Sequence, residues 1–415
     1  MSTDAAARRS GCTITRVLND TLMRAAVALA ALVLPACGGP VEGPEPQGVS
    51  DIYIGDPPGT TVETWVEGLE VPWSLVFLPD GRALVSERPG RIRLIVDGDL
   101  AETPYATFTT SEGLPTSSFD KALSLFFTGE GGLMGLAAHP RFDEHPYVYA
   151  IYTYRRDDGT DANRVVRLVD QGLTGRLDRV ILDDIPAAIF HDGGRIGFGP
   201  DEMLYVATGD ASEPDLSQDH ASLAGKILRL TPEGEVPDDN PFPGSPVWSL
   251  GHRNPQGLAW HPKTGDLFSS EHGPTSEFGL FARDEINLIR PGGNYGWPKA
   301  VGAPGLPGYS DPLVVWTNAA IPPAGATFKD DDLFVATLEN EALVRIALSR
   351  NAAGWQVREI EHWFADQRAE GRFGRLRDVT LGPDGALYFA TSNHDGKRRP
   401  RPGDDRIYRL TLDER

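Results

Sequence analysis

Six short stretches of this sequence combine histidine, arginine or carboxylate side chains with glycine, and each lies close to an apolar run. A neutral imidazole can accept a proton near neutral pH, and a guanidinium group holds an anion in a fixed geometry. A single histidine is more often structural, and an arginine more often forms a surface ion pair, so the chemistry depends on what brings the stretches together. They are residues 191–198, 207–210, 250–258, 270–274, 283–298 and 374–379.

Several common kinds of site are absent from the sequence. It has no serine nucleophile elbow, no dinucleotide-binding loop and no Cys-x-x-Cys-His haem motif. The two cysteines, Cys12 and Cys37, precede residue 40, so the region after it has no disulfide and no thiolate metal site. With 39 basic and 59 acidic residues the net charge is −20, which disfavours nucleic acid as a partner.

A repeated turn-and-strand unit must position the polar stretches. A proline that leads into a β-branched or aromatic strand recurs, with prolines at residues 79, 140, 200, 262 and 383. The steps are 61, 60, 62 and 121 residues, and a copy without the proline at residues 329–336 fills the double step. A constant step is typical of a repeat fold, and about four short strands per step favour propeller blades over helical solenoids.

The sequence therefore predicts an all-β fold, a six-bladed β-propeller of four-stranded blades, over residues 60–415. A strand at residues 61–66 is expected to pair with one at residues 406–412, because this closes the ring and removes both sheet edges. Loops at one end of a propeller channel converge, so the six stretches can form one site.

The first 37 residues have the features of a lipoprotein-type signal peptide. Arg24 precedes ten apolar residues, and Leu34-Pro35-Ala36-Cys37 resembles a bacterial lipobox, in which the cysteine is acylated. An ordinary signal peptide with an incidental cysteine is the alternative, and Met23 would be a natural start of translation. Residues 38–59, rich in glycine, proline and acid, are predicted to be a flexible tether. The protein is thus expected in the periplasm, outer membrane or cell surface, with membrane contact only through a lipid anchor.

Three motifs within the polar stretches resemble those of the soluble pyrroloquinoline quinone (PQQ)-dependent aldose dehydrogenases, which include glucose dehydrogenases. They are GHRNPQGLAW from Gly251, DEINLI-x-PGGNYGWP from Asp284 and RLRDV-x-x-GPDG from Arg375. The resemblance extends from about residue 65 to residue 412 and implies a six-bladed propeller. It also implies a small-molecule substrate, an aldose sugar that is oxidised at C1 to the lactone, with hydride transfer to the quinone. The electrons then pass to an electron acceptor that the sequence does not name.

The resemblance also implies roles for individual residues. His191 matches the catalytic base, and Asp210 matches the acid that holds the base and supports its charged form. Guanidinium groups would stabilise the negative charge that the cofactor gains on reduction. The residues that match contacts to the quinone oxygens and to the cofactor carboxylates are Arg253, Asn254, Arg375 and Arg377.

Calcium is implied by the resemblance at two places. The backbone carbonyls of Gly273 and Pro274 match ligands of a cofactor-bound ion, and Glu285 with the carbonyl of Tyr295 matches a second, structural ion. Oxygen ligands of this kind suit Ca²⁺ better than zinc. The alternative for Glu285 is an ordinary loop carboxylate with its own hydrogen-bond partners. Residues 275–282 are an insertion relative to the pattern, so the rim of the site is altered.

Two acidic residues depart from the family pattern. Glu130 stands where a glutamine contacts the reacting centre, and a carboxylate cannot donate a hydrogen bond unless it is protonated. Glu339 stands near the position of a lysine that contacts the quinone, where a carboxylate would repel an anionic cofactor at a cost on the order of a few kcal/mol. One alternative is therefore a non-catalytic propeller that binds a glycan or a protein, similar to the hedgehog-interacting type. A calcium-propeller hydrolase, in which His191 and Asp210 activate water, is another.

Overall fold

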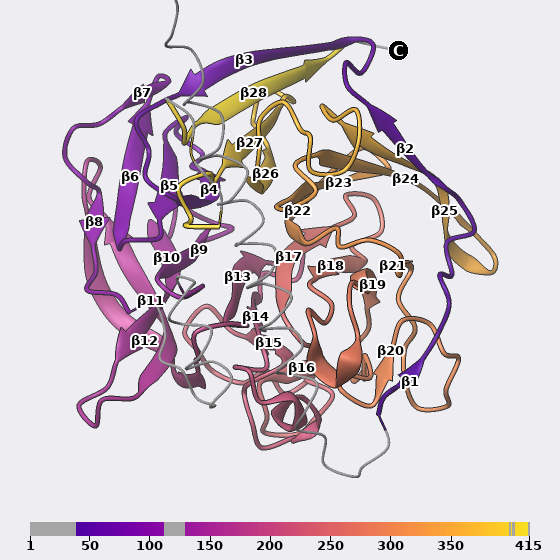
Figure 1. The fold of residues 1–415 in the computed structure, drawn as a ribbon. Helices are drawn as coiled ribbons and strands as arrows, with labels where there is room; N and C mark the ends of the chain where they lie inside the picture. Colours follow the sequence, from indigo (N-terminus) through magenta and orange to yellow (C-terminus); the bar gives the residue numbers. More distant parts are fainter. Residues whose placement is uncertain (1–38, 112–128, 398–399, 401–402, 414–415) are drawn as a thin grey trace, which may run out of the picture.

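The computed structural model describes residues 39–111, 129–397, 400 and 403–413, and these form an almost entirely β-structure. Figure 1 shows small twisted sheets arranged in a ring around a central axis. The predicted signal peptide and Cys37 lie outside the described residues. None of the helices in the described ranges has the length and apolar character needed to cross a membrane.

Six sheets of at least four strands follow one another around the ring, which confirms the predicted number of blades. The first blade contains β4 (Pro72–Phe77), β5 (Ala83–Glu87), β6 (Arg91–Val96) and β7 (Asp99–Leu100), with β8 (Ala106–Thr107) also paired to β6. The second contains β9 (Leu133–Ala138), β10 (Tyr147–Arg155), β11 (Asp161–Asp170) and β12 (Gly175–Pro186). The third contains β13 (Gly193–Phe198), β14 (Leu204–Thr208), β15 (Lys226–Leu230) and β16 (Val247–Leu250), with the 3₁₀-helix η1 (Pro214–Gln218) between β14 and β15.

The remaining three blades complete the ring in chain order. The fourth contains β17 (Pro255–Trp260), β18 (Leu267–Glu271), β19 (Asp284–Ile289) and β21 (Val314–Trp316), with η2 (Glu277–Gly279) between β18 and β19. The fifth contains β22 (Pro323–Lys329), β23 (Asp332–Thr337), β24 (Leu343–Asn351) and β25 (Gly354–Trp363). The sixth contains β26 (Leu376–Leu381), β27 (Leu387–Thr391), β28 (Ile407–Leu412) and, from the other end of the chain, β3 (Thr60–Val66).

The recurring turns join the first and second strands of their blades and so lie at one end of the ring. In the first blade the amide of Leu78 donates to the carbonyl of Arg82 over 2.8 Å, and Gly81 reverses the chain at φ +90°. The corresponding turn of the sixth blade has the same bond, from Gly382 to Ala386 at 2.8 Å. Because these strands are antiparallel, the start of the first strand and the end of the second lie at the opposite end of the ring. The polar stretches occupy these positions.

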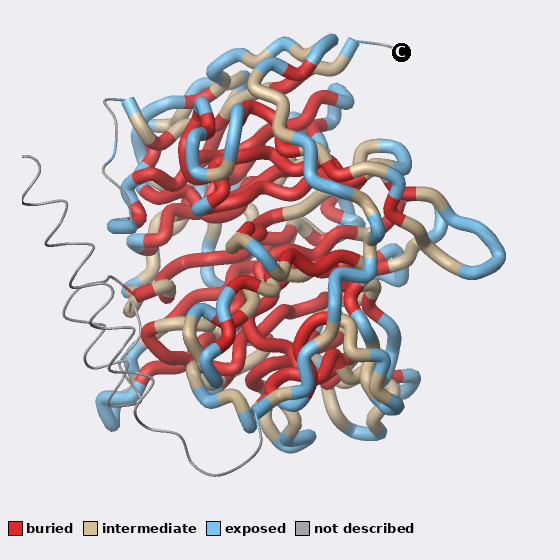
Figure 2. Tube along the Cα trace, turned by 45° about the vertical axis from the view of Figure 1, so that its right-hand side comes forward, coloured by how far each residue is buried: buried red, intermediate tan, exposed pale blue. Residues whose placement is uncertain are grey.

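The first strands of the six blades surround the axis, and each contacts the first strand of the next blade. The contacts run from β4 to β9, β13, β17, β22 and β26 and return to β4. Between blades the inward-facing apolar side chains interlock, as Met134 of β9 does with Ile196 of β13 in one core cluster. Figure 2 shows that the buried residues follow the strands, whereas the exposed residues lie mainly in the outer turns and edges. The core is therefore a ring of inter-blade layers.

The two ends of the propeller meet in the sixth blade, as the sequence predicted. Val66 of β3 pairs with Ile407 of β28, and the antiparallel ladder extends to Thr60 and Leu412. This pairing gives the last blade its fourth, outermost strand from the start of the propeller and so joins the two ends of the propeller in one sheet.

Residues 39–59 differ from the flexible tether that their composition predicted. β1 (Val41–Glu42) pairs in parallel with β20 (Ala300–Val301), and β2 (Asp51–Ile54) pairs in parallel with β25, so the segment follows the outside of the ring (Figure 1). The acidic side chain of Glu42 forms an ion pair with Arg283 at 2.6 Å. The composition failed as a guide because free strand edges on the propeller, rather than local propensity, order this segment.

Replacing Leu410 with alanine should destabilise the closing blade by about 2–5 kcal/mol, because the side chain is fully buried among apolar neighbours and leaves a cavity. The free energy of unfolding in urea would measure the loss. Leu177→Ala, at a side chain that is 52% exposed on β12, is the control and should stay within about 0.5 kcal/mol of wild type. If both variants lose the same free energy of unfolding, the packing of β28 does not stabilise the closing blade.

Candidate active site

The residues singled out in the sequence gather at one end of the channel, although they come from different blades. Apart from Glu285 and Tyr295, each lies just before the first strand of a blade, within that strand or just after the second strand, and antiparallel pairing brings these places to the same end. Those before or within first strands are Glu130, His191, Arg253, Asn254, Arg375 and Arg377, and those after second strands are Asp210, Gly273, Pro274 and Glu339.

His191 and Asp210 form a close pair. Nδ1 of His191 lies 2.7 Å from Oδ1 of Asp210, and the other carboxylate oxygen accepts a hydrogen bond of 2.7 Å from Nε1 of Trp297. Asp210 is fully buried and the side chain of His191 is 13% exposed, so only the imidazole reaches the open side of the pair. This arrangement places a proton on Nδ1 and makes Nε2 the acceptor nitrogen of a neutral imidazole.

Glycine allows the two chain segments to meet at this pair. Gly193 has φ +67°, and a Cβ atom at Gly209 would lie 1.9 Å from the carbonyl oxygen of His191. His191 itself adopts φ +66°, a left-handed conformation that an L-residue other than glycine rarely takes. Such strain is characteristic of residues held in place by their surroundings at a functional site.

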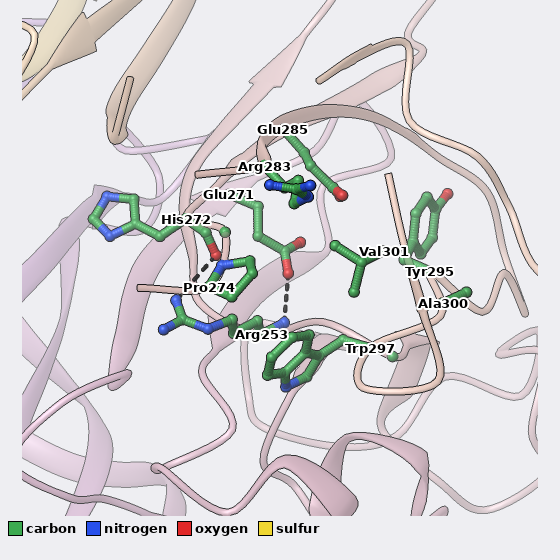
Figure 3. Close-up of a pocket in the computed structure, with 12 residues that line it drawn as sticks. Arg253, Glu271, His272, Pro274, Arg283, Glu285, Tyr295, Trp297, Ala300 and Val301 are labelled. Carbon is green, nitrogen blue, oxygen red and sulfur yellow. Dashed lines mark hydrogen bonds between the residues drawn. The ribbon is translucent and has the colours of Figure 1, made fainter. Parts of the chain in front are cut away.

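The side chain of Arg253 connects His191 to the neighbouring loop. Its Nη2 donates to Nε2 of His191 over 2.8 Å and contacts the carboxylate of Glu277. Figure 3 shows the backbone amide of Arg253 bonded to Glu271 and its guanidinium bonded to the carbonyl of His272, the latter at 3.2 Å. The guanidinium lies 5.5 Å from the ring centre of Trp297. Arg253 is therefore fixed from both its backbone and its side chain.

Charges around His191 raise the pKa of its imidazole. Burial and the positive charge of Arg253 oppose protonation, but the carboxylates of Asp210 and Glu277 outweigh both. The imidazole can therefore accept a proton more readily than an isolated histidine does, and the resulting imidazolium would be stabilised by its neighbours.

Arg375 and Arg377 give this end of the channel two more buried cations. Nε of Arg375 pairs with Asp395 at 2.7 Å, whereas Nη1 of Arg377 donates to the neutral amide of Gln256 at 2.9 Å. Burial lowers the pKa of Arg377 to about 10, because Asp395 and Glu130 compensate its charge only in part. Its Nε has no hydrogen-bond partner within the described structure. A buried cation of this kind favours the approach of an anion.

The side chains of Asn254 and Glu130 contact each other next to the backbone of His191. Nδ2 of Asn254 donates to Oε2 of Glu130 at 3.3 Å, and the same oxygen accepts from the backbone amide of His191 at 3.1 Å. The other oxygen of Glu130 pairs with Lys397 at 2.9 Å. Burial favours the neutral acid, but Lys397 and His191 outweigh it and hold the pKa of Glu130 well below its usual range. Glu130 is thus an ionised hydrogen-bond acceptor. The sequence motifs did not include its partner, Lys397.

Glu339 lies at the rim and forms an ion pair with Arg368 at 2.8 Å; its side chain is 58% exposed. Solvent and this arginine screen the charge that was expected to repel an anionic cofactor. Besides Asp210, another carboxylate lies beside the imidazole of His191, and it also forms an ion pair with Arg253. It belongs to Glu277, in the insertion at residues 275–282. The sequence identified the insertion but not the direction of its side chains.

A small pocket lies beside Arg253, on the side of β19. Gly273, Pro274, Glu285 and Tyr295 all line it, together with Glu271 (Figure 3). Burial and the nearby charge of Glu271 raise the pKa of Glu285 well above its usual range, which a divalent cation would reverse. Among the described residues no three Asp, Glu, His or Cys side chains form a metal-binding group, so an ion here would need backbone carbonyls as ligands.

Comparison with known proteins identifies the family. A family model described as Glucose / Sorbosone dehydrogenase matches residues 69–408, which is most of the chain. The chain belongs to this family. It is 30% identical to the aldose sugar dehydrogenase YliI of Escherichia coli (strain K12) over 371 residues, 82% of this chain and 92% of that protein.

Solved structures agree with this family membership. A putative oxidoreductase (glucose dehydrogenase) from Thermus thermophilus is 52% identical, with a TM-score of 0.76 over 85% of this chain and 100% of that one. The PQQ-bound aldose sugar dehydrogenase of Streptomyces coelicolor is 38% identical, with a TM-score of 0.70 over 86% of this chain and 100% of that one. Mouse hedgehog-interacting protein, by contrast, is 26% identical over 41% of this chain and 25% of its own length. The non-catalytic alternative therefore rests on a weaker and shorter likeness.

Proposed function

We propose that this family member is a PQQ- and Ca²⁺-dependent dehydrogenase that oxidises an aldose sugar at C1 to the lactone. The observation that carries the proposal is the His191–Asp210 pair beside the buried guanidinium of Arg253, at the channel end where Arg375 and Arg377 also lie. The PQQ-bound form of the similar Streptomyces coelicolor protein supports the choice of cofactor.

The residues at the channel end fit a planar, multiply anionic cofactor. Arg253 and Arg377 are buried, and Nε of each lacks a hydrogen-bond partner in the part of the chain that the structure describes. An N–H donor that lacks a partner in this way is stabilised when an anion accepts a hydrogen bond from it. Arg253 and Asn254 would hold the quinone oxygens, and Arg375 and Arg377 the carboxylates. When bound, PQQ supplies an electrophilic quinone that accepts the hydride.

The proton of the reacting hydroxyl would pass to Nε2 of His191. Asp210 accepts from Nδ1 and so keeps the lone pair of Nε2 directed outward, while the indole of Trp297 fixes Asp210. The hydrogen bond from Arg253 to Nε2 marks the side from which a donor hydroxyl would approach. As the proton arrives, the carboxylates of Asp210 and Glu277 stabilise the imidazolium, and Arg253 is positioned to stabilise negative charge that develops beside it.

Removing bound metal should lower the melting temperature, and Ca²⁺ should restore it through a site that includes Glu285. At a Ca²⁺ concentration about 100 times the Kd, the stabilisation would be about 2.7 kcal/mol. Thermal unfolding of chelator-treated protein with and without Ca²⁺ measures it. Glu285→Gln should lose most of the shift, whereas the surface control Glu359→Gln should keep it. A shift that survives Glu285→Gln would place the ion elsewhere.

The function is tested with residues 38–415, which include β1 and β2 because these strands pack on the propeller. PQQ is titrated into the Ca²⁺-loaded protein by calorimetry, and dye reduction is then followed over a panel of aldoses, with the product identified by NMR. We expect PQQ binding, dye reduction and a lactone. Folded protein that does not bind PQQ would refute the proposal, and binding without turnover of any aldose would favour the non-catalytic propeller.

A further inference from the structure

The insertion at residues 275–282 places a carboxylate next to the proton-accepting atom of His191. Oε1 of Glu277 contacts Nη2 of Arg253 and lies 3.7 Å from Nε2 of His191. Oε2 accepts hydrogen bonds from the backbone amides of Thr275 at 2.7 Å and Ser276 at 2.9 Å. One oxygen is therefore held by the insertion itself, while the other faces the base.

The same insertion provides an aromatic ring beside this carboxylate. Phe278 is 46% exposed, and its ring centre lies 5.8 Å from that of Trp297, which supports Asp210. A carboxylate next to an exposed aromatic ring offers a hydrogen-bond acceptor together with an apolar surface. Sugars present the complementary groups, because their hydroxyls donate hydrogen bonds and their C–H faces are apolar.

We propose that Glu277 is a specificity-determining residue that accepts a hydrogen bond from the substituent next to the oxidised carbon of the sugar. This inference rests on the proposed function, in which the C1 hydroxyl donates to Nε2 of His191. Nε2 of His191 and Oε1 of Glu277 lie 3.7 Å apart, so two adjacent hydroxyls of one sugar can each donate to one of these acceptors. A C1 hydroxyl on His191 would therefore bring the C2 substituent to Glu277.

The charge of Glu277 defines the substrate class. Burial favours its neutral form, but Arg253 and His191 outweigh this and hold the pKa of Glu277 well below its usual range, so the side chain can only accept. A free hydroxyl or an ammonium group at C2 would donate to Oε1 of Glu277 and be bound, whereas a hydrogen atom at C2 would give this oxygen no hydrogen bond from the sugar. An anionic substituent at this position would be repelled.

A comparison of matched substrates on matched variants isolates this contact. Glucose, 2-deoxyglucose and glucosamine are compared on wild type, Glu277→Gln and Glu277→Ala, with PQQ and Ca²⁺ present. Substitution of Glu277 frees Arg253 and can change how much PQQ is bound. The ratio of kcat/KM for two sugars on the same variant is unaffected by this change, because both sugars meet the same PQQ-loaded protein. Sugar binding is measured in parallel by saturation-transfer NMR, which needs no turnover. Glu63→Gln, which neutralises an exposed partner of Arg409 on the closing blade, is the control.

Wild type should prefer glucose to 2-deoxyglucose by about 10- to 100-fold, the value of a charge-assisted hydrogen bond. The preference should shrink in Glu277→Gln and fall below about threefold in Glu277→Ala, while Glu63→Gln keeps it. The same ranking in NMR binding without dye reduction would support the contact and refute the redox function. A ratio unchanged by Glu277→Ala, or glucosamine that binds equally to wild type and Glu277→Ala, would overturn the inference even if every variant oxidises glucose.

Discussion

Replacing His191 with alanine should lower kcat for aldose oxidation by about a thousandfold, because the proton of the C1 hydroxyl then has no positioned acceptor. PQQ binding should stay within about threefold of wild type, since Arg253, Arg375 and Arg377 are unchanged. Stopped-flow reduction of the PQQ-loaded protein by sugar measures the chemical step, and calorimetry measures the binding. The fold should persist, because the imidazole is partly exposed and its main partner is Asp210.

Two further measurements distinguish a base from a structural histidine. His220→Ala removes an exposed histidine that packs on Phe242, and it should leave kcat unchanged. In wild type, kcat/KM should fall as the pH drops through the pKa of His191, which lies above the ordinary histidine value. Asp210→Asn should move this acidic limb to lower pH, because the carboxylate that raises the pKa is gone, and should also lower kcat. If the acidic limb of kcat/KM stays at the same pH in both His191→Ala and Asp210→Asn, the assignment of His191 as the base is wrong.

The ring of blades could be predicted from the sequence because each blade repeats the same local chemistry. The turns at Leu78 and Gly382, more than 300 residues apart, have the same proline, the same left-handed glycine and the same backbone hydrogen bond. Closure by β3 and β28 followed from the need to pair two edges. β1 and β2 were missed because they are short, and their partners are edges that exist only once the blades have formed.

The candidate site was predictable where residues stand inside specific motifs, and less so where distant loops meet. His191, Asp210 and Arg253, which the motifs singled out, lie together in the structure, and their roles stay predictions. Lys397 pairs with Glu130 from 267 residues away, a contact that no local pattern encodes. The insertion was visible only as extra length, and its fold decides that Glu277, rather than Glu339, supplies the carboxylate beside Arg253. Side-chain direction in such loops depends on tertiary contacts.

Replacing Arg377 with glutamine should have opposite effects on cofactor binding and on stability. Loss of one charge-assisted bond should raise the Kd for PQQ by about 10- to 100-fold. The cofactor-free protein should nevertheless become more stable. Burial lowers the pKa of this guanidinium to about 10 in the folded state, so at neutral pH the charged form is less stable in the fold than in the unfolded chain. A neutral glutamine removes that cost.

Calorimetric titration with PQQ and thermal unfolding without PQQ measure the two effects on the same preparation. Arg179→Gln, at a side chain that is 54% exposed on β12, is the matched control and should change neither. A general disturbance of the blade would lower both affinity and melting temperature, whereas a purely structural arginine would lower only the melting temperature. Only a site that keeps a buried cation unpaired in order to receive an anion predicts weaker binding together with a higher melting temperature. Such trade-offs between stability and function are expected where a binding site is organised before its ligand arrives.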